Sequence, residues 1–120
     1  MVRAGSLRGD LPSRPLAYEI TDLIVDHPGL RVERIVSSGH ATPEGEWYDQ
    51  TSSEWVLVVA GAARLRIEGE PVDRALGEGD WLLLPAHCRH RVTWTQATPP
   101  TIWLAIHFEN LEERYPLADG

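Results

Sequence analysis

Turn-forming residues interrupt this chain at short and fairly even intervals, and this rhythm constrains its fold more than any other feature. Glycine and proline, whose backbone geometry favours tight turns, recur after almost every short apolar run. The turn signals are Pro28-Gly29, Gly39, Pro43-Glu44-Gly45, Gly61, Glu68-Gly69-Glu70-Pro71, Gly77-Glu78-Gly79-Asp80, Pro85 and Pro99-Pro100. Long helices do not fit between these turns, so the spacing predicts an all-β sandwich or barrel.

The apolar runs between the turns are typical of strands. The expected strands cover residues 30–37, 47–50, 54–60, 63–68, 72–76, 81–84, 90–95 and 101–108. Residues 63–68 alternate strictly, which puts their apolar side chains on a core face and their charged side chains in water. The runs 54–60 and 101–108 are apolar on both faces. We therefore expect these two strands to be covered on both sides.

The two ends of the chain carry weaker signals. Residues 1–15 mix charged, Gly, Ser and Pro residues without apolar periodicity, which indicates an irregular N-terminal arm. Residues 18–26 fit either a strand or a short helical turn, and residues 110–115 fit a terminal helical turn. A chain of 120 residues has the size of one domain, so residues 16–120 are expected to form a single barrel domain.

Charge and cysteine content exclude several classes of function. The formal net charge is −7, so neither a nucleic-acid-binding nor an anionic-membrane surface is expected. All 11 basic residues are arginine, which excludes a catalytic lysine and Schiff-base chemistry. The single Cys88 cannot form an internal disulfide, and no signal peptide or membrane span is recognisable, so a cytoplasmic location is expected. Any metal would have to be held by histidine and oxygen ligands.

Two short motifs resemble those of the cupin superfamily. Residues 79–90 match the second cupin motif, with Gly79, Pro85 and a final His90 at the family spacing. His87 departs from it, because the family has glycine two residues after the proline. Glu54 and the turn residue Gly61 resemble the end of the first motif. The resemblance covers about residues 39–92 by motif and implies a small double-stranded β-helix, or jelly-roll, cupin barrel.

The opening of the first motif is degenerate. Two histidines one residue apart normally precede the acid, but these slots hold Tyr48 and Gln50, or Trp47 and Asp49, depending on the spacing. The resemblance implies a divalent-metal site, with Zn, Fe, Mn or Ni as the ion. The ligands that it implies are Glu54 and His90, completed by either Gln50 or Asp49. A glutamine binds metal more weakly than the histidine it replaces.

Strand periodicity indicates which residues would share the barrel interior. If Glu54 and His90 point inward, residues two positions apart along each strand follow them. The expected interior sets are Glu54, Val56 and Val58; His90, Val92 and Trp94; and Trp103, Ala105 and His107. They form a mostly apolar pocket with a few polar groups, which is the usual composition of a ligand site.

Several residues have a functional and a structural interpretation. His107 could join Glu54 and His90 in a two-histidine, one-carboxylate iron site, or hydrogen-bond a substrate or water. Tyr48 could transfer a proton as a catalytic residue, as could His107, or simply pack at the barrel mouth. Cys88 is expected to be a small buried thiol. Two further groups are expected to lie outside the pocket: the loop histidines His27 and His40, and an outer arginine face of Arg64, Arg66, Arg89 and Arg91.

Two classes of function remain open. The first is a metal-dependent cupin enzyme acting on a small organic molecule, with Glu54 and His90 as ligands. The second is a metal-free module or sensor that binds a sugar or small acid in the same cavity, which the missing motif histidines favour. In both cases the partner is a small-molecule ligand or substrate, and the family likeness also implies a homodimer.

Overall fold

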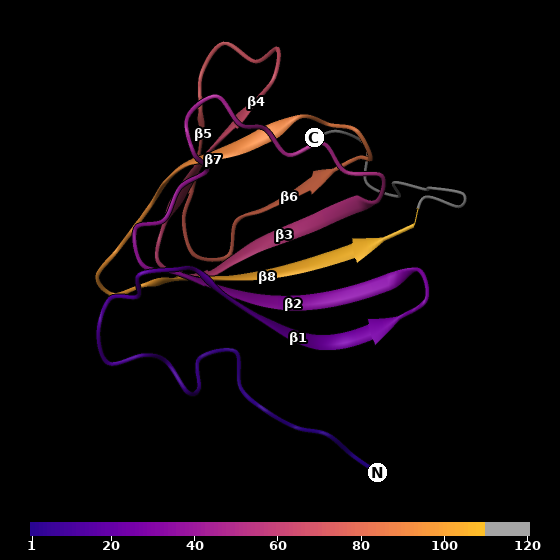
Figure 1. Ribbon diagram of the computed structural model, residues 1–120, viewed down its shortest axis with the longest axis vertical. Helices are drawn as coiled ribbons and strands as arrows, with labels where there is room; N and C mark the ends of the chain where they lie inside the picture. The colour runs from indigo at the N-terminus through magenta and orange to yellow at the C-terminus, as the bar shows by residue number, and fades with distance from the viewer. Residues whose placement is uncertain (110–120) are drawn as a thin grey trace.

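The computed structural model describes residues 1–109 and contains two antiparallel β-sheets. Figure 1 shows the larger sheet on one side of the molecule and the smaller sheet on the other. The strands are β1 (Ile20–His27), β2 (Leu30–Ser37), β3 (Ser53–Ala60), β4 (Ala63–Ile67), β5 (Arg74–Leu76), β6 (Trp81–Leu84), β7 (His90–Thr95) and β8 (Thr101–Phe108). The all-β prediction is confirmed. No apolar helix of the length that crosses a bilayer occurs within the described part.

The order of the strands brings distant parts of the sequence together. The larger sheet has the order β1-β2-β8-β3-β6, and the smaller sheet has the order β5-β4-β7. The last strand, β8, lies between β2 and β3 and pairs with both of them. The chain crosses from one sheet to the other at Gly61, between β3 and β4. These crossings put inward-facing residues of both sheets around one interior.

Apolar side chains from both sheets fill that interior. The buried cluster contains Val56, Val58, Ala63, Leu65, Leu76, Leu84 and Trp103. The two members from β3 and the two from β4 lie two residues apart within their strands, because successive side chains of a strand point to opposite faces. The predicted core face of residues 63–68 is therefore correct for β4. The outer faces of β3 and β8 are also largely covered, as their two-sided apolar pattern predicts.

The structure differs from the sequence prediction in two segments near the pocket. Residues 47–50 do not form a strand and make only an isolated bridge between Tyr48 and His90. Residues 20–27 form the full edge strand β1, which resolves the choice between strand and helical turn. The expected turn at residues 110–115 lies outside the described residues. The N-terminal arm contacts the larger sheet, where the guanidinium of Arg34 donates to the carbonyl of Leu7 at 3.2 Å.

A β-bulge on β7 reverses the expected direction of Trp94. Arg64 pairs with Trp94, but the next residue of β4, Leu65, pairs with Val92, so one extra residue is inserted in β7. Such an insertion shifts the inside–outside alternation by one position. Trp94 is therefore 46% exposed and stacks under the guanidinium of Arg64, while Thr95 is 2% exposed. The prediction that Trp94 faces the interior is wrong.

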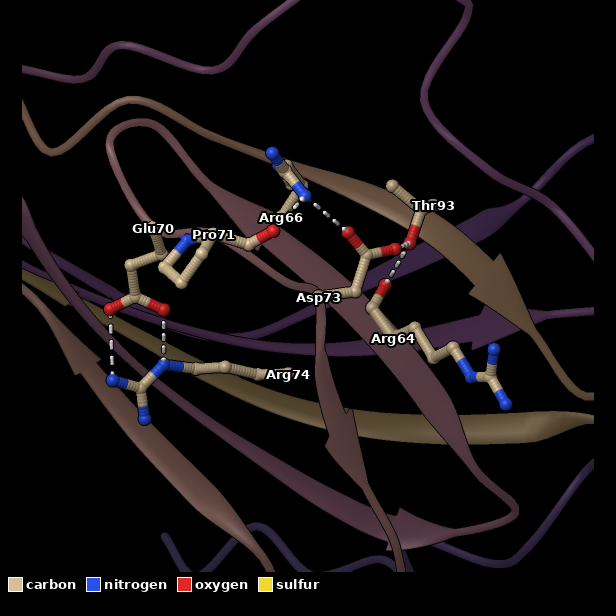
Figure 2. Close-up of polar contacts among 7 residues, drawn as sticks. All are labelled: Arg64, Arg66, Glu70, Pro71, Asp73, Arg74 and Thr93. Atoms are coloured by element: carbon tan, nitrogen blue, oxygen red, sulfur yellow. Dashed lines mark hydrogen bonds and ion pairs between the residues drawn. The ribbon is translucent and has the colours of Figure 1, made fainter.

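Polar contacts organise the outer face of the smaller sheet, as the arginine pattern predicts. Figure 2 shows the carboxylate of Asp73 between Arg66 and Thr93. Its Oδ1 atom lies 3.4 Å from Arg66 Nη1, and its Oδ2 atom accepts a 2.6 Å hydrogen bond from the Thr93 hydroxyl. The Thr93 hydroxyl holds the pKa of Asp73 below its ordinary value, and Arg66 adds to this effect. Arg74 and Glu70 form a second pair nearby, at 2.8 Å.

Candidate functional site

A cavity of about 370 Å³ lies between the two sheets. Its apolar wall includes Val56, Leu65 and Trp103, which belong to the core cluster. Two segments outside the strands, residues 17–19 and 40–43, complete the wall together with Tyr48 and Gln50. The cavity has the volume of a small-molecule site and combines apolar walls with a few polar groups.

Four ionisable side chains meet on one side of this cavity. They come from four strands: Glu33 from β2, Glu54 from β3, His90 from β7 and His107 from β8. The Oε1 atom of Glu54 is 3.6 Å from Nε2 of His90, and its Oε2 atom is 3.6 Å from Nε2 of His107. Glu54 is 9% exposed, and the two histidines are 5% and 7% exposed. Because burial of an isolated charge is costly, these groups must compensate one another or bind a cation.

Sheet register explains why these residues converge. Glu54 and His107 are directly paired between β3 and β8, so their side chains leave the sheet on the same face. Glu33 lies on β2, which is next to β8, and because it is two residues from Ile35 its side chain faces inward as that of Ile35 does. His90 approaches from the smaller sheet as the first residue of β7. The expectation that Glu54, His90 and His107 face one interior therefore agrees with their positions.

A backbone carbonyl fixes the imidazole of His90. The Nδ1 atom lies 2.8 Å from the carbonyl oxygen of Cys88, and because a carbonyl only accepts hydrogen bonds, Nδ1 carries a proton. Nε2 consequently faces the carboxylate of Glu54. Burial by itself lowers the pKa of His90, but Glu54 and the Cys88 carbonyl outweigh it, so the pKa is raised overall. The environment therefore favours a positive charge at Nε2.

His107 is held by a second carboxylate that the sequence analysis did not identify. Its Nε2 atom lies 2.9 Å from Oε1 of Glu33, and the other oxygen of Glu33 is 3.3 Å from Nε of Arg31. Hydrogen bonding to Glu33 requires a proton on Nε2 of His107. Glu33 stands two residues before Ile35 inside an apolar strand, so the periodicity applied to the other strands could have identified it.

Tyr48 lies against His90 at the rim of the cavity. Their backbones exchange two hydrogen bonds, of 2.7 and 3.1 Å, and their rings stack with centroids 5.4 Å apart. Burial and the nearby carboxylate of Glu19 raise the pKa of Tyr48, so its hydroxyl remains a hydrogen-bond donor at neutral pH. Its side chain is 43% exposed, which leaves it accessible to a ligand.

Gln50 and Asp49 point in different directions. Gln50 lines the cavity, whereas Asp49 lies outside it and places Oδ1 2.9 Å from Nδ1 of His87. His87 has a φ of 63° and donates its backbone N–H to the carbonyl of Gln50 at 2.7 Å. The left-handed conformation explains why glycine is usual at this slot. Of the two alternatives left open by the sequence, Gln50 is the one that faces the cavity.

The structure corrects one expectation for each loop histidine: His40 borders the cavity, and His27 is the last residue of β1 rather than part of a loop. His40, expected to be exposed, is half-buried and lines the cavity, and its Nδ1 accepts a 2.9 Å hydrogen bond from the Ser38 N–H. The carbonyl of His40 also accepts from the buried Thr95 hydroxyl, which draws this loop inward. His27 is exposed as expected. Cys88 is half-buried and packs against the core, and burial raises its pKa.

The residues present suit a divalent metal in chemistry but not in arrangement. Imidazole nitrogen and carboxylate oxygen are the donors that Zn, Fe, Mn and Ni accept. The Nδ1 anchor of His90 is the kind of contact that orients metal-binding imidazoles. Within residues 1–109, however, no group of three or more His, Cys, Asp or Glu side chains is positioned to hold an ion. Metal binding at this site would require side-chain rotation, first of all at His107.

Comparison with sequence families and curated proteins gives one match. The family model described as "Cupin domain" matches residues 33–107, which include Glu33, Glu54, His90 and His107. No curated protein matches the chain.

Solved structures provide further similarities. A "putative mannose-6-phosphate isomerase" from Ralstonia eutropha JMP134 is 45% identical, with a TM-score of 0.87 over 90% of this chain and 99% of that one. A cupin superfamily protein from Desulfitobacterium hafniense DCB-2 is 14% identical, with a TM-score of 0.69 over 83% of this chain and 84% of that one. FeII HppE is 18% identical, with a TM-score of 0.64 over 76% of this chain and 50% of its own. The last two show the fold alone.

Proposed function

Because this chain belongs to the cupin domain family, we propose that its cavity is the site of a metal-dependent enzyme acting on a small organic molecule. The small double-stranded β-helix barrel of the family supplies the enclosure. The cavity of about 370 Å³ accommodates a small ligand on the order of a monosaccharide.

The geometry of His90 carries the proposal. In its neutral form the ring has its proton on Nδ1, so the lone pair of Nε2 is directed at the carboxylate of Glu54, 3.6 Å away. Two electron-rich atoms facing each other at a buried position repel unless a positive charge lies with them. Either a proton on Nε2 or a metal ion supplies that charge. Carbonyl anchoring of Nδ1 is typical of histidines that bind metal.

Glu54 and His90 would hold the ion, and the amide oxygen of Gln50 and the ring of His107 are the further donors within the cavity. A divalent ion held there would polarise a carbonyl or hydroxyl oxygen of the substrate. His107 is the poorer of these two donors, because its Nε2 is protonated and already hydrogen-bonded to Glu33. A ligand set of Gln50, Glu54 and His90 is weaker than one with three histidines, so weak metal binding is expected.

The remaining polar residues of the cavity would orient the substrate and move protons. The Tyr48 hydroxyl has a raised pKa and stays protonated, so it suits hydrogen bonding to a substrate oxygen or donation of a proton to it. Glu33 holds the His107 ring and keeps a proton on its Nε2.

Metal analysis of the purified protein tests the proposal. After incubation with Fe, Mn, Ni and Zn in turn and removal of free ions, we expect about one ion per chain for at least one metal. His90→Ala should lose it, whereas His27→Ala, at the exposed end of β1, should retain it. Circular dichroism of both variants establishes that they are folded. Metal content at background for all four ions would exclude the metal-dependent enzyme.

A metal-free binding module is the second candidate. It is favoured by the direct contact of His107 with Glu33 and by the lack of an assembled metal-binding group among the described residues. In that case a proton on Nε2 of His90 compensates Glu54, as its raised pKa permits. Ligand-induced thermal shifts that persist in EDTA would support this candidate. Shifts that EDTA abolishes and one metal restores would support the enzyme.

A further inference from the structure

We propose that the cavity selects neutral, hydroxyl-rich molecules such as unmodified sugars and rejects phosphorylated or carboxylated ones. This inference rests on the proposed small-molecule function and adds a substrate class to it. It also separates this chain from the substrate that the name of its 45% identical relative suggests, because a mannose 6-phosphate carries a dianionic group.

Fixed charges around the cavity are predominantly negative. Three carboxylates line it, those of Glu19, Glu33 and Glu54, and the only guanidinium among its described lining residues is that of Arg31. Arg31 is already paired with Glu33, with Nε 3.3 Å from Oε2. Phosphate recognition normally uses unpaired guanidinium or ammonium groups, or a helix N-terminus. The described part of the cavity wall provides neither.

The histidines do not reverse this balance. His90 faces Glu54, and His107 lies between Glu54 and Glu33, so a proton on either ring serves a carboxylate that is already present. His40 accepts a hydrogen bond at Nδ1 from the Ser38 N–H, which leaves Nε2 as a neutral N–H donor. The three carboxylates and the single guanidinium leave two negative charges in excess, and a divalent ion beside Glu54 would only cancel them. A phosphate ester would still find no surplus of positive charge.

The same wall is well suited to hydroxyl groups. Carboxylates such as Glu19 accept hydrogen bonds from hydroxyls, and the Gln50 amide and the Tyr48 hydroxyl both donate and accept. The Tyr18 side chain borders the cavity and is 83% exposed, so its ring is free to pack against the C–H face of a sugar. Glu19 borders the cavity close enough to Tyr48 to raise the pKa of its hydroxyl, and one oxygen of Glu19 already accepts a hydrogen bond from the Ser37 hydroxyl, which leaves the other for a ligand hydroxyl.

Matched pairs of ligands that differ only in charge test the inference. Thermal shift and calorimetric titration would compare mannose with mannose 6-phosphate, ribose with ribose 5-phosphate, and glucose with glucuronate. We expect at least one neutral member to bind at least tenfold more tightly than its charged partner, a difference of about 1.4 kcal/mol. Glu19→Gln should reduce the ratio of the neutral to the charged ligand's affinity severalfold, because the substitution removes a negative charge that repels the charged ligand. Glu70→Gln, an acid outside the cavity, should leave it unchanged.

Each result decides the question. A charged member that binds as tightly as its neutral partner, or a panel in which no neutral sugar binds, overturns the inference. Running every titration both in EDTA and with added Mn²⁺ separates the inferred selectivity for neutral ligands from the proposed metal dependence. Neutral-sugar binding that is unaffected by EDTA would refute the metal-dependent enzyme and leave the inference intact. Retained metal together with preferred binding of a phosphate ester would refute the inference alone.

Discussion

Replacing Gly61 by alanine should destabilise the fold far more than the same change at Gly45. Both glycines have a left-handed backbone, with φ of 87° and 84°. Alanine in this conformation costs about 1–2 kcal/mol, partly offset by about 0.4–1 kcal/mol from the less flexible unfolded chain. Gly45 has open space around it, so only this net cost of about 1 kcal/mol is expected there.

At Gly61 a second cost is added. A Cβ atom would lie 2.8 Å from the Cα of Thr101, which is a backbone atom at the start of β8. Thr101 cannot move freely, because it is buried and its hydroxyl contacts the carbonyls of Ala62 and Gln96 at 3.1 and 2.9 Å. Overpacking of this kind costs about 1–3 kcal/mol. The total for Gly61→Ala is therefore about 2–4 kcal/mol.

Urea unfolding followed by tryptophan fluorescence measures both variants against the parent protein. We expect Gly61→Ala to lower the unfolding free energy by at least about 1 kcal/mol more than Gly45→Ala, with similar slopes if the transition stays two-state. Equal losses at the two positions would refute the steric argument and leave backbone strain as the only cause. Such a result would leave the left-handed backbone as the physical reason for a glycine at the end of the first cupin motif.

Three further predictions concern other parts of the molecule. His87→Gly should leave the urea midpoint nearly unchanged, because relief of left-handed strain offsets the loss of an exposed pair with Asp49 worth under about 1 kcal/mol, whereas His87→Ala should lower it. Asp73 is stabilised as a carboxylate in the folded state, so its contribution to the free energy of unfolding is complete above the ordinary aspartate pKa of about 3.9 and is lost as the pH falls through the lowered folded value. Asp73→Asn should therefore flatten the acid limb of a stability–pH curve. An unchanged limb would contradict the contact in Figure 2. Burial raises the pKa of Cys88, so Ellman's reagent should react with it at pH 8 more slowly in the native protein than in urea, and equal rates would show that the thiol is accessible.

Local patterns were sufficient to predict most of the strands. The bounds of β2, β6, β7 and β8 agree with the sequence prediction, because each strand lies between strong turn signals. Residues 47–50 were assigned wrongly because aromatic residues favour strands, yet this segment has only the single bridge from Tyr48 to His90. Trp94 was assigned wrongly because strict alternation ignores bulges, and a bulge arises from the pairing of two strands rather than from either sequence alone.

The candidate site was only partly accessible to the same reasoning. Motif spacing and parity correctly directed attention to Glu54, His90 and His107, whose roles remain proposals. Periodicity could have placed Glu33 on the inward face of its strand, but its contact with His107 depends on β8 inserting next to β2, a neighbour that lies far away in the sequence. Likewise, only the packing of the 40–43 loop against the barrel shows that His40 borders the cavity.

The sequence by itself determined the all-β class, the inward faces of most strands and the family, since these follow from side-chain period, turn chemistry and short motifs. Tertiary structure alone decided that Glu33 holds His107, that Gln50 rather than Asp49 faces the cavity and that the cavity is acidic. The physical reason is that periodicity fixes a side chain's direction relative to its own strand. Its partners depend on which strands become neighbours, and this is settled by the packing of the whole chain.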